Sequence, residues 1–64
     1  MRLDNIEKQQ LIDRYGNSKR NREIIRMKWI DGETYEHVAE EFDMSSRQIW
    51  NILHDFMILA GLLR

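Results

Sequence analysis

Apolar residues in this 64-residue chain recur every three or four positions, as in helices, rather than alternating as in strands. A loose apolar stripe near the amino terminus contains Leu3, Ile6, Leu11, Ile12 and Tyr15. Asp4 is followed three residues later by Glu7, which has the form of an amino-terminal cap, so we expect a first helix over about residues 4–14. Gly16-Asn17 should end this helix, because both residues tolerate left-handed backbone angles.

A second helix is predicted from its cap, Ser18, to about Ile30. Its core-facing residues are expected to be Ile24, Ile25, Met27 and Trp29. The pair Asp31-Gly32 should end the helix with a glycine cap. The same pair can close a β-hairpin, but the flanking apolar residues have helical spacing.

Two more helices are predicted after this turn. Thr34 begins a short one over residues 35–42, with Val38, Ala39 and Phe42 on its buried face and Glu36, His37, Glu40 and Glu41 outward. Asp43-Met44 forms the next turn, since Asp accepts a left-handed conformation better than most residues. Ser45 then caps a fourth helix that continues to Gly61. Its apolar residues recur at helical offsets and are Ile49, Ile52, Leu53, Phe56 and Ala60.

The predicted fold is therefore all-α, a small bundle of about four helices in a single domain over residues 1–64. The last two helices, with the turn between them, have the outline of a helix-turn-helix with its core at residues 35–54. Absence of proline, only three glycines and 33% charged residues favour helices joined by short turns. Without cysteine, packing or oligomerisation has to stabilise the fold.

Several functional classes are not expected. A chain of this size buries too little surface for a deep catalytic cleft, and it has no nucleophile-and-base arrangement or phosphate loop, so we do not expect an enzyme or a cofactor. The spacing of His37 and His54 does not suit a metal site. No secretory signal or membrane-spanning run is visible, which predicts a cytoplasmic protein without a membrane partner.

The charge of the chain is strongly polarised. The net charge of −1 argues against a nucleic-acid binder. However, residues 1–30 carry eight basic and four acidic side chains, whereas residues 31–64 carry two and seven. Lys19 and Arg20 fall in the first turn of a predicted helix, where the helix dipole disfavours cations and a phosphate would relieve the clash. We therefore predict DNA contacts from Lys19, Arg20, Arg22 and Arg26; a solvated helix end is the alternative.

A resemblance to a known family covers residues 22–53, REIIRMKWIDGETYEHVAEEFDMSSRQIWNIL. This segment resembles region 4 of sigma factors, their promoter-recognising helix-turn-helix, and more distantly the small phage activators of the middle-operon-regulator type. The matching features are the basic start, the apolar pattern before Asp31-Gly32, Tyr35, Val38-Ala39-Glu40 and the serine-started last helix. The segment departs from the sigma pattern at His37, where an acid is usual, at Asp43, where glycine is common, and in its less basic recognition helix. The resemblance implies a small phage or bacterial transcriptional regulator, but not a complete sigma factor, since region 2 is missing.

A recognition helix enters the major groove by its amino-terminal turns, so the polar face of residues 46–60 is the predicted reading surface. Its members, with the cap, are Ser45, Ser46, Arg47, Trp50, Asn51 and His54. Arg47 can pair with guanine and Asn51 with adenine. Ser45 and Ser46 suit phosphates, and Trp50 a sugar or thymine methyl. The alternatives are that Ser45 only caps the helix and that Trp50 only packs on a neighbour.

The run FMILAGLL at residues 56–63 places apolar side chains on every side of the predicted helix. We predict that it forms a homodimer interface from Phe56, Met57, Ile58, Leu59, Leu62 and Leu63. Such a dimer would present two recognition helices to half-sites about 34 Å apart. Folding back onto the first helix is the alternative.

Other functions remain open from the sequence. The acidic residues Glu33, Glu36, Glu40 and Glu41 should face solvent or a basic protein. The chain can accordingly be a protein-interaction adaptor, bound to RNA polymerase or a host regulator. It can also be the DNA-recognition subunit of a DNA-processing assembly such as a terminase.

Overall fold

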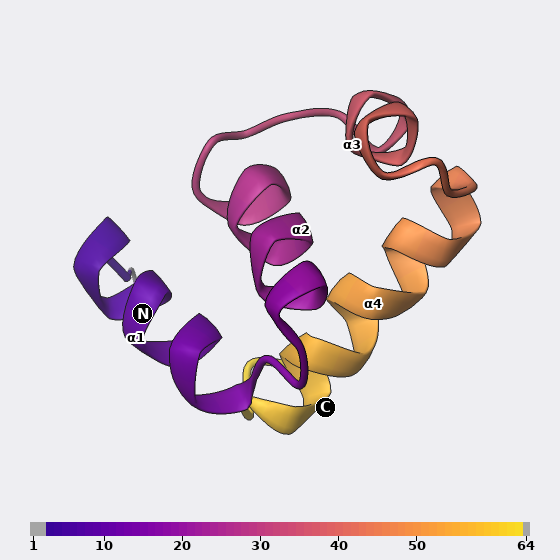
Figure 1. Cartoon of the computed structure of the whole chain (residues 1–64). Coiled ribbons are helices and arrows are strands. Elements are labelled where there is room, and N and C mark those ends of the chain that lie inside the picture. Colours follow the sequence, from indigo (N-terminus) through magenta and orange to yellow (C-terminus); the bar gives the residue numbers. More distant parts are fainter. Residues whose placement is uncertain (1–2, 64) are drawn as a thin grey trace.

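The computed structural model describes residues 3–63 as four α-helices without a strand in that range (Figure 1). The helices are α1 (Asn5–Tyr15), α2 (Lys19–Trp29), α3 (Tyr35–Phe42) and α4 (Ser46–Leu59). The all-α prediction is confirmed, and α4 ends two residues before the predicted Gly61. No helix within the described range is long and apolar enough to cross a lipid bilayer.

Each helix begins with the predicted side-chain cap. The Asp4 carboxylate accepts from the Glu7 N–H at 2.8 Å, and the Glu7 carboxylate accepts from the Asp4 N–H at 3.3 Å. Ser18 and Thr34 cap α2 and α3 by accepting from the N–H three residues on. These caps satisfy backbone donors that have no partner inside the helix, so local sequence alone specifies the four starts.

The turn after α3 has the left-handed residue expected at Asp43. Its φ is 53°, and among the described residues it is the one non-glycine with a positive φ. The Met44 N–H donates to the Ala39 carbonyl at 2.9 Å, and the Asp43 N–H reaches the Glu40 carbonyl at 3.4 Å. This pair of bonds is the Schellman arrangement, which ends α3 sharply and frees the chain to start α4 in a new direction.

The end of α4 differs from the prediction. Gly61 has a φ of 75°, and the Leu62 N–H bonds to the Met57 carbonyl at 2.9 Å, so a second Schellman turn follows Leu59. Leu62 and Leu63 therefore lie beyond the helix, and the expectation that FMILAGLL surrounds one continuous helix is wrong.

Gly16 is required for a reason other than the predicted one. Its φ is −71°, which any residue adopts. A β-carbon there would clash with Cγ of Arg22 and lie 2.7 Å from the Ile12 carbonyl oxygen. The turn between α1 and α2 thus needs glycine for the close approach of the Ile12 carbonyl and the Arg22 side chain rather than for a left-handed backbone.

All four helices contribute to one apolar core. Its buried residues are Ile12 of α1, Ile24 and Ile25 of α2, Val38 and Ala39 of α3, and Ile49, Leu53 and Phe56 of α4. The predicted core residues Met27, Trp29, Phe42, Ile52 and Ala60 are partly buried against this cluster. Ile6 was predicted to lie on the apolar stripe of the first helix, and this is wrong, since its side chain is 72% exposed. Six residues at about 100° each place Ile6 roughly 120° around the helix from Ile12, so the two cannot share one face.

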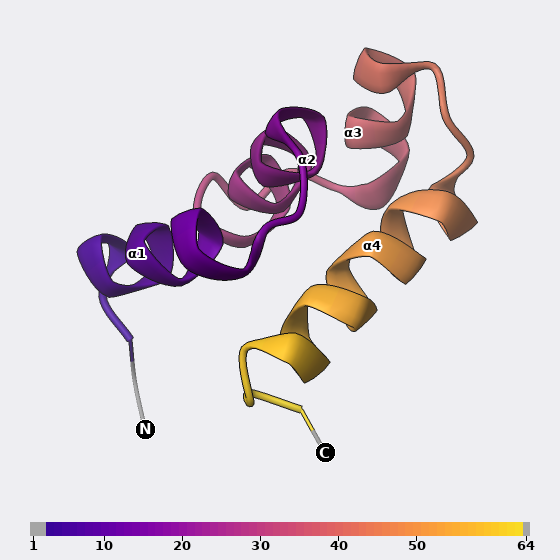
Figure 2. The ribbon, with the colours of Figure 1, turned by 60° about the horizontal axis from the view of Figure 1, so that its bottom comes forward.

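α2 lies between α1 and the α3–α4 pair in both views of the ribbon (Figures 1 and 2), and it packs against all three helices. α3 and α4 also pack on each other after the turn at residues 43–45. Figure 1 looks nearly along the axis of α3 and across the axis of α4, so the two axes are steeply inclined. A helix-turn-helix requires such an inclination; the helix-turn-helix assignment and its use in DNA binding both stay predictions.

Candidate nucleic-acid interface

The outward face of α4 carries the polar residues predicted to read DNA. Ile49 and Leu53 are buried against the core, whereas Arg47 and Asn51 are exposed on the opposite side. Because Arg47 and Asn51 are four residues apart, they are neighbours on the helix surface. Ser46 and His54 are half-buried, so they lie at the border of this face rather than at its centre.

Arg47, Trp50 and His54 form a stacked row along α4. The Trp50 and His54 rings lie 4.7 Å apart between centroids and are nearly parallel, at 14°. The guanidinium carbon of Arg47 lies 5.3 Å from the Trp50 ring centroid. Arg47 precedes Trp50 by about one turn and His54 follows by about one turn, so the indole ring lies between them. A cation held against an indole in this way has less rotational freedom to lose on binding.

The Ser45 hydroxyl accepts a hydrogen bond from the Gln48 N–H at 3.2 Å, and the Gln48 side chain accepts from the Ser45 N–H at 2.9 Å. The capping role of Ser45 is therefore present, with a contribution from Gln48 that was not predicted. A hydroxyl that accepts one bond still has its proton to donate, so contact between Ser45 and a phosphate stays a prediction.

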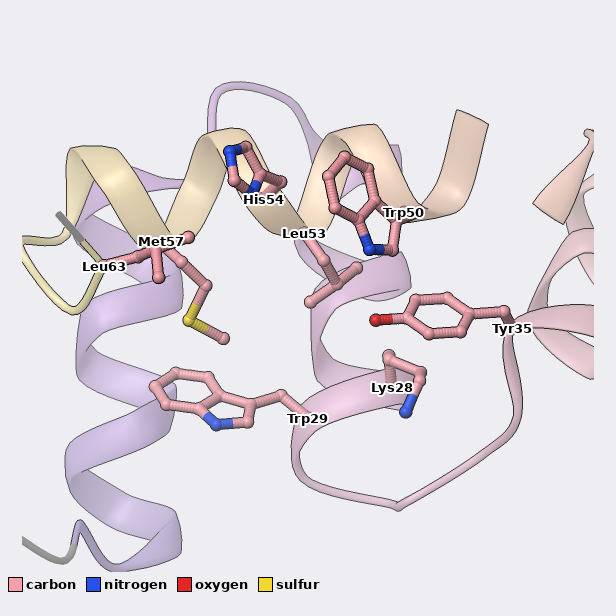
Figure 3. Close-up of a pocket in the computed structure, with 8 residues that line it drawn as sticks. All are labelled: Lys28, Trp29, Tyr35, Trp50, Leu53, His54, Met57 and Leu63. Carbon is pink, nitrogen blue, oxygen red and sulfur yellow. The ribbon is translucent and has the colours of Figure 1, made fainter. Parts of the chain in front are cut away.

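A groove of about 360 Å³ runs between α2 and one flank of α4 (Figure 3). It is lined by Lys28, Trp29, Tyr35, Trp50, Leu53, His54, Met57 and Leu63. A second hollow of about 340 Å³ is lined by Tyr35, Glu36, Ser46, Arg47 and Trp50. The two hollows share Tyr35 and Trp50 and lie next to each other along the flank of α4, and we refer to the two together as the α4 trough.

Lys28 and Tyr35 belong to this site but were not predicted as site residues. The Lys28 ammonium lies 4.6 Å from the centroid of the Tyr35 ring. The position of Lys28 could have been predicted from helical spacing. It comes four residues after Ile24 and three after Ile25, so it lies on the side of α2 that faces the core. Tyr35 gave no such signal, since its place depends on how α3 crosses α2 and α4.

The other predicted cations of α2 lie elsewhere. Lys19, Arg22 and Arg26 line a separate hollow of about 120 Å³ with Gln9 of α1 and Glu23. Their common position follows from their spacing of three and four residues, which places them on one side of α2. DNA contacts from this group stay a prediction, but the group does not line the α4 trough.

Three of these α2 cations already have intramolecular partners. Arg22 donates to the Gly16 carbonyl at 3.2 Å, which ties α2 to the turn before it. Arg26 pairs with Asp31 at 3.4 Å, and Arg20 donates to the side chain of Asn21 at 3.2 Å. The arginines are therefore partly committed to local contacts.

The prediction that Phe56 belongs to the oligomer interface is wrong, because Phe56 is buried in the core. Its side chain is 3% exposed, because the ring packs edge-on against Trp29 with centroids 5.6 Å apart. Met57 is half-buried and lines the groove. The remaining predicted interface residues are 41–57% exposed and are Ile58, Leu59, Leu62 and Leu63. α1 does not cover them, so the folding-back alternative does not account for this surface.

The acidic residues of α3 point outward as predicted. Glu36, Glu40 and Glu41 are exposed, and Glu33 approaches the His37 imidazole at 3.6 Å. Within residues 3–63, no group of three or more His, Asp or Glu side chains is placed to hold a metal ion. This surface is an acidic face beside the polar face of α4, and Glu36 borders the hollow that Ser46, Arg47 and Trp50 line.

Comparison with known protein families, with characterised proteins and with solved structures found no match.

Proposed function

We propose that this chain is a sequence-specific double-stranded DNA-binding protein, a small transcriptional regulator whose α4 enters the major groove. The observation that carries the proposal is the division of α4 into two faces. Ile49 and Leu53 hold the helix to the core, while Arg47 and Asn51 remain exposed within its first two turns. Each bidentate contact from such a side chain supplies roughly 1–3 kcal/mol of discrimination between bases.

The position of α4 in the molecule supports the same function. α4 starts at the periphery, away from α1, where its first turn can approach a duplex (Figure 1). The Schellman turn at Asp43 sets this direction by ending α3 abruptly. The same surface would serve a DNA-processing assembly, since it depends only on the duplex.

We also propose that the chain forms a homodimer. Ile58, Leu59, Leu62 and Leu63 expose apolar surface at the carboxyl end of α4 and beyond. Pairing two copies there would cover this surface and bring two recognition helices to one DNA site. The same apolar surface, together with the acidic face of α3, favours a second candidate, an adaptor that binds RNA polymerase or another protein.

Selection of duplexes from a random pool, followed by equilibrium binding, tests the proposal. We expect Arg47→Ala and Asn51→Ala each to reduce the preference for the selected site over a scrambled one by roughly 5- to 150-fold. Arg14→Ala is the matched control, because Arg14 is an exposed arginine on α1. If neither α4 variant changes this preference, α4 is not the reading element. Failure of the parent chain to enrich any sequence would favour the adaptor.

A further inference from the structure

The larger hollow of the α4 trough contains hydrogen-bond donors and no acidic side chain. The donors come from Lys28, Tyr35 and the indoles of Trp29 and Trp50. None of the eight residues that line this hollow is acidic, although the chain contains 11 Asp and Glu residues. Such a lining favours an anion, and the apolar walls favour one that also carries carbon surface.

The donors converge in the close-up of the groove. Figure 3 shows the Tyr35 hydroxyl directed into the groove between Trp50 and Lys28. The Trp50 indole nitrogen lies on the ring edge nearer to Tyr35 (Figure 3). Within residues 3–63, no side-chain hydrogen bond uses any of these three groups. All three are therefore available to an incoming acceptor.

The surroundings of Trp50 favour a hydrogen bond from its ring edge over stacking of a base on its ring face. A base that stacks needs a free ring face, as on the platforms that bind single strands. Arg47 and His54 already lie against the Trp50 ring, which leaves less ring face for a base to stack on, and the N–H edge lies nearer to Tyr35 (Figure 3). An edge donor suits a phosphate oxygen, which every nucleotide supplies regardless of sequence.

The direction of the trough fits a strand of a duplex. It follows α4 from Ser46 to Met57, a distance of about 16 Å along a helix. A helix inserted in the major groove has a phosphate backbone along each flank. Glu36 lines the far hollow and its carboxylate repels a phosphate, so the Ser46 hydroxyl would be the phosphate contact at that end.

We infer that the α4 trough binds the sugar–phosphate backbone of one DNA strand. Lys28 supplies the charged contact, and the Tyr35 hydroxyl and Trp50 N–H supply neutral ones. The inference rests on the proposed function, because it places the strand by the insertion of α4. It adds a sequence-independent site, separate from the base-reading face of Arg47 and Asn51.

The test measures affinity for the selected duplex and for a scrambled duplex at several salt concentrations. Lys28→Gln removes the charge and keeps a long polar side chain, so the magnitude of the salt slope should fall by about 0.9 on both duplexes. Tyr35→Phe removes a neutral donor, so affinity should fall by about two- to tenfold on both with the slope unchanged. Lys8→Gln is the matched control: Lys8 also lies over an indole, 5.3 Å from the Trp29 centroid, but does not line the trough.

A second readout identifies the source of the phosphate. Trp50 is one of two tryptophans, so its indole N–H signal is easily assigned in a nitrogen-15 spectrum. We expect this signal to shift with the duplex and not with inorganic phosphate at the same phosphate concentration. An equal shift with inorganic phosphate would overturn the strand assignment in favour of a small-anion site.

Failure of the trough inference and failure of the proposed DNA-binding function give different results. If Lys28→Gln leaves both salt slopes unchanged while Arg47→Ala still loses discrimination, the trough inference is wrong and the proposed function stands. If the parent chain binds no duplex even at low salt, both are wrong. Circular dichroism of each variant confirms that the four helices are retained.

Discussion

The turn at Asp43 offers a sharp test of the geometry that directs α4 outward. Asp43 has φ 53° and ψ 48°, a left-handed conformation at a residue with a β-carbon. The two bonds that close the turn use backbone atoms only, including the Met44 N–H to Ala39 carbonyl bond at 2.9 Å. Asp43→Gly therefore keeps these bonds and removes the steric conflict.

Two opposing terms set the expected change in the free energy of unfolding. The left-handed conformation costs an ordinary residue roughly 1–2 kcal/mol. Glycine loses about 0.5–1 kcal/mol more backbone entropy on folding. Asp tolerates the left-handed region better than an ordinary residue, so the difference favours Asp43→Gly by about 0.5 kcal/mol, which corresponds to a rise in Tm of about 2–4 °C for a domain of this size. Asp43→Val should instead lose on the order of 1–3 kcal/mol, since a β-branched residue is poorly tolerated at positive φ.

Urea unfolding followed by circular dichroism measures both changes. Asp55→Gly is the matched control, because Asp55 is exposed within α4, where the same substitution should destabilise by a few tenths of a kcal/mol. Opposite signs for the two glycine variants are the expected result. If Asp43→Gly destabilises as Asp55→Gly does, residue 43 is not left-handed and the direction given to α4 is wrong.

Four further outcomes follow from the contacts described. Ile49→Ala should cost about 2–5 kcal/mol of unfolding free energy, because Ile49 is fully buried between α4 and the core; urea unfolding checks this. Gly16→Ala should lower the free energy of unfolding by about 1–3 kcal/mol in the same assay, since the new β-carbon would clash with the Ile12 backbone carbonyl, which cannot move aside as a side chain can. Glu36→Gln should strengthen binding to any duplex by roughly two- to fivefold in titrations at low salt, because its carboxylate lines the far hollow of the α4 trough. Leu59→Glu should abolish self-association in sedimentation equilibrium without loss of helicity, and an unchanged oligomeric state would exclude this surface as the dimer interface.

Much of the fold is predictable because its signals are local. Asp4 with Glu7, and Ser18, Thr34 and Ser45, each cap a helix through residues only three positions away. Asp43 likewise adopts the left-handed conformation expected from its place between two apolar helical patterns. These features depend on backbone groups that the same short segment supplies.

The features that were not predicted depend on contacts between helices. Gly16 is small because Arg22 crosses it, and Phe56 is buried because Trp29 of another helix packs on its ring. The candidate site shows the same division. The exposure of Arg47 and Asn51 follows from periodicity within α4, whereas the trough joins Lys28 and Tyr35 to Trp50 from three helices.

A nitrogen-15 NMR titration with the selected duplex tests whether the outward face of α4 binds DNA. We expect the largest amide shifts within residues 45–54, together with shifts of the side-chain signals of Arg47 and Asn51. Shifts concentrated in α1 or in residues 58–63, with residues 45–54 unchanged, would contradict this expectation.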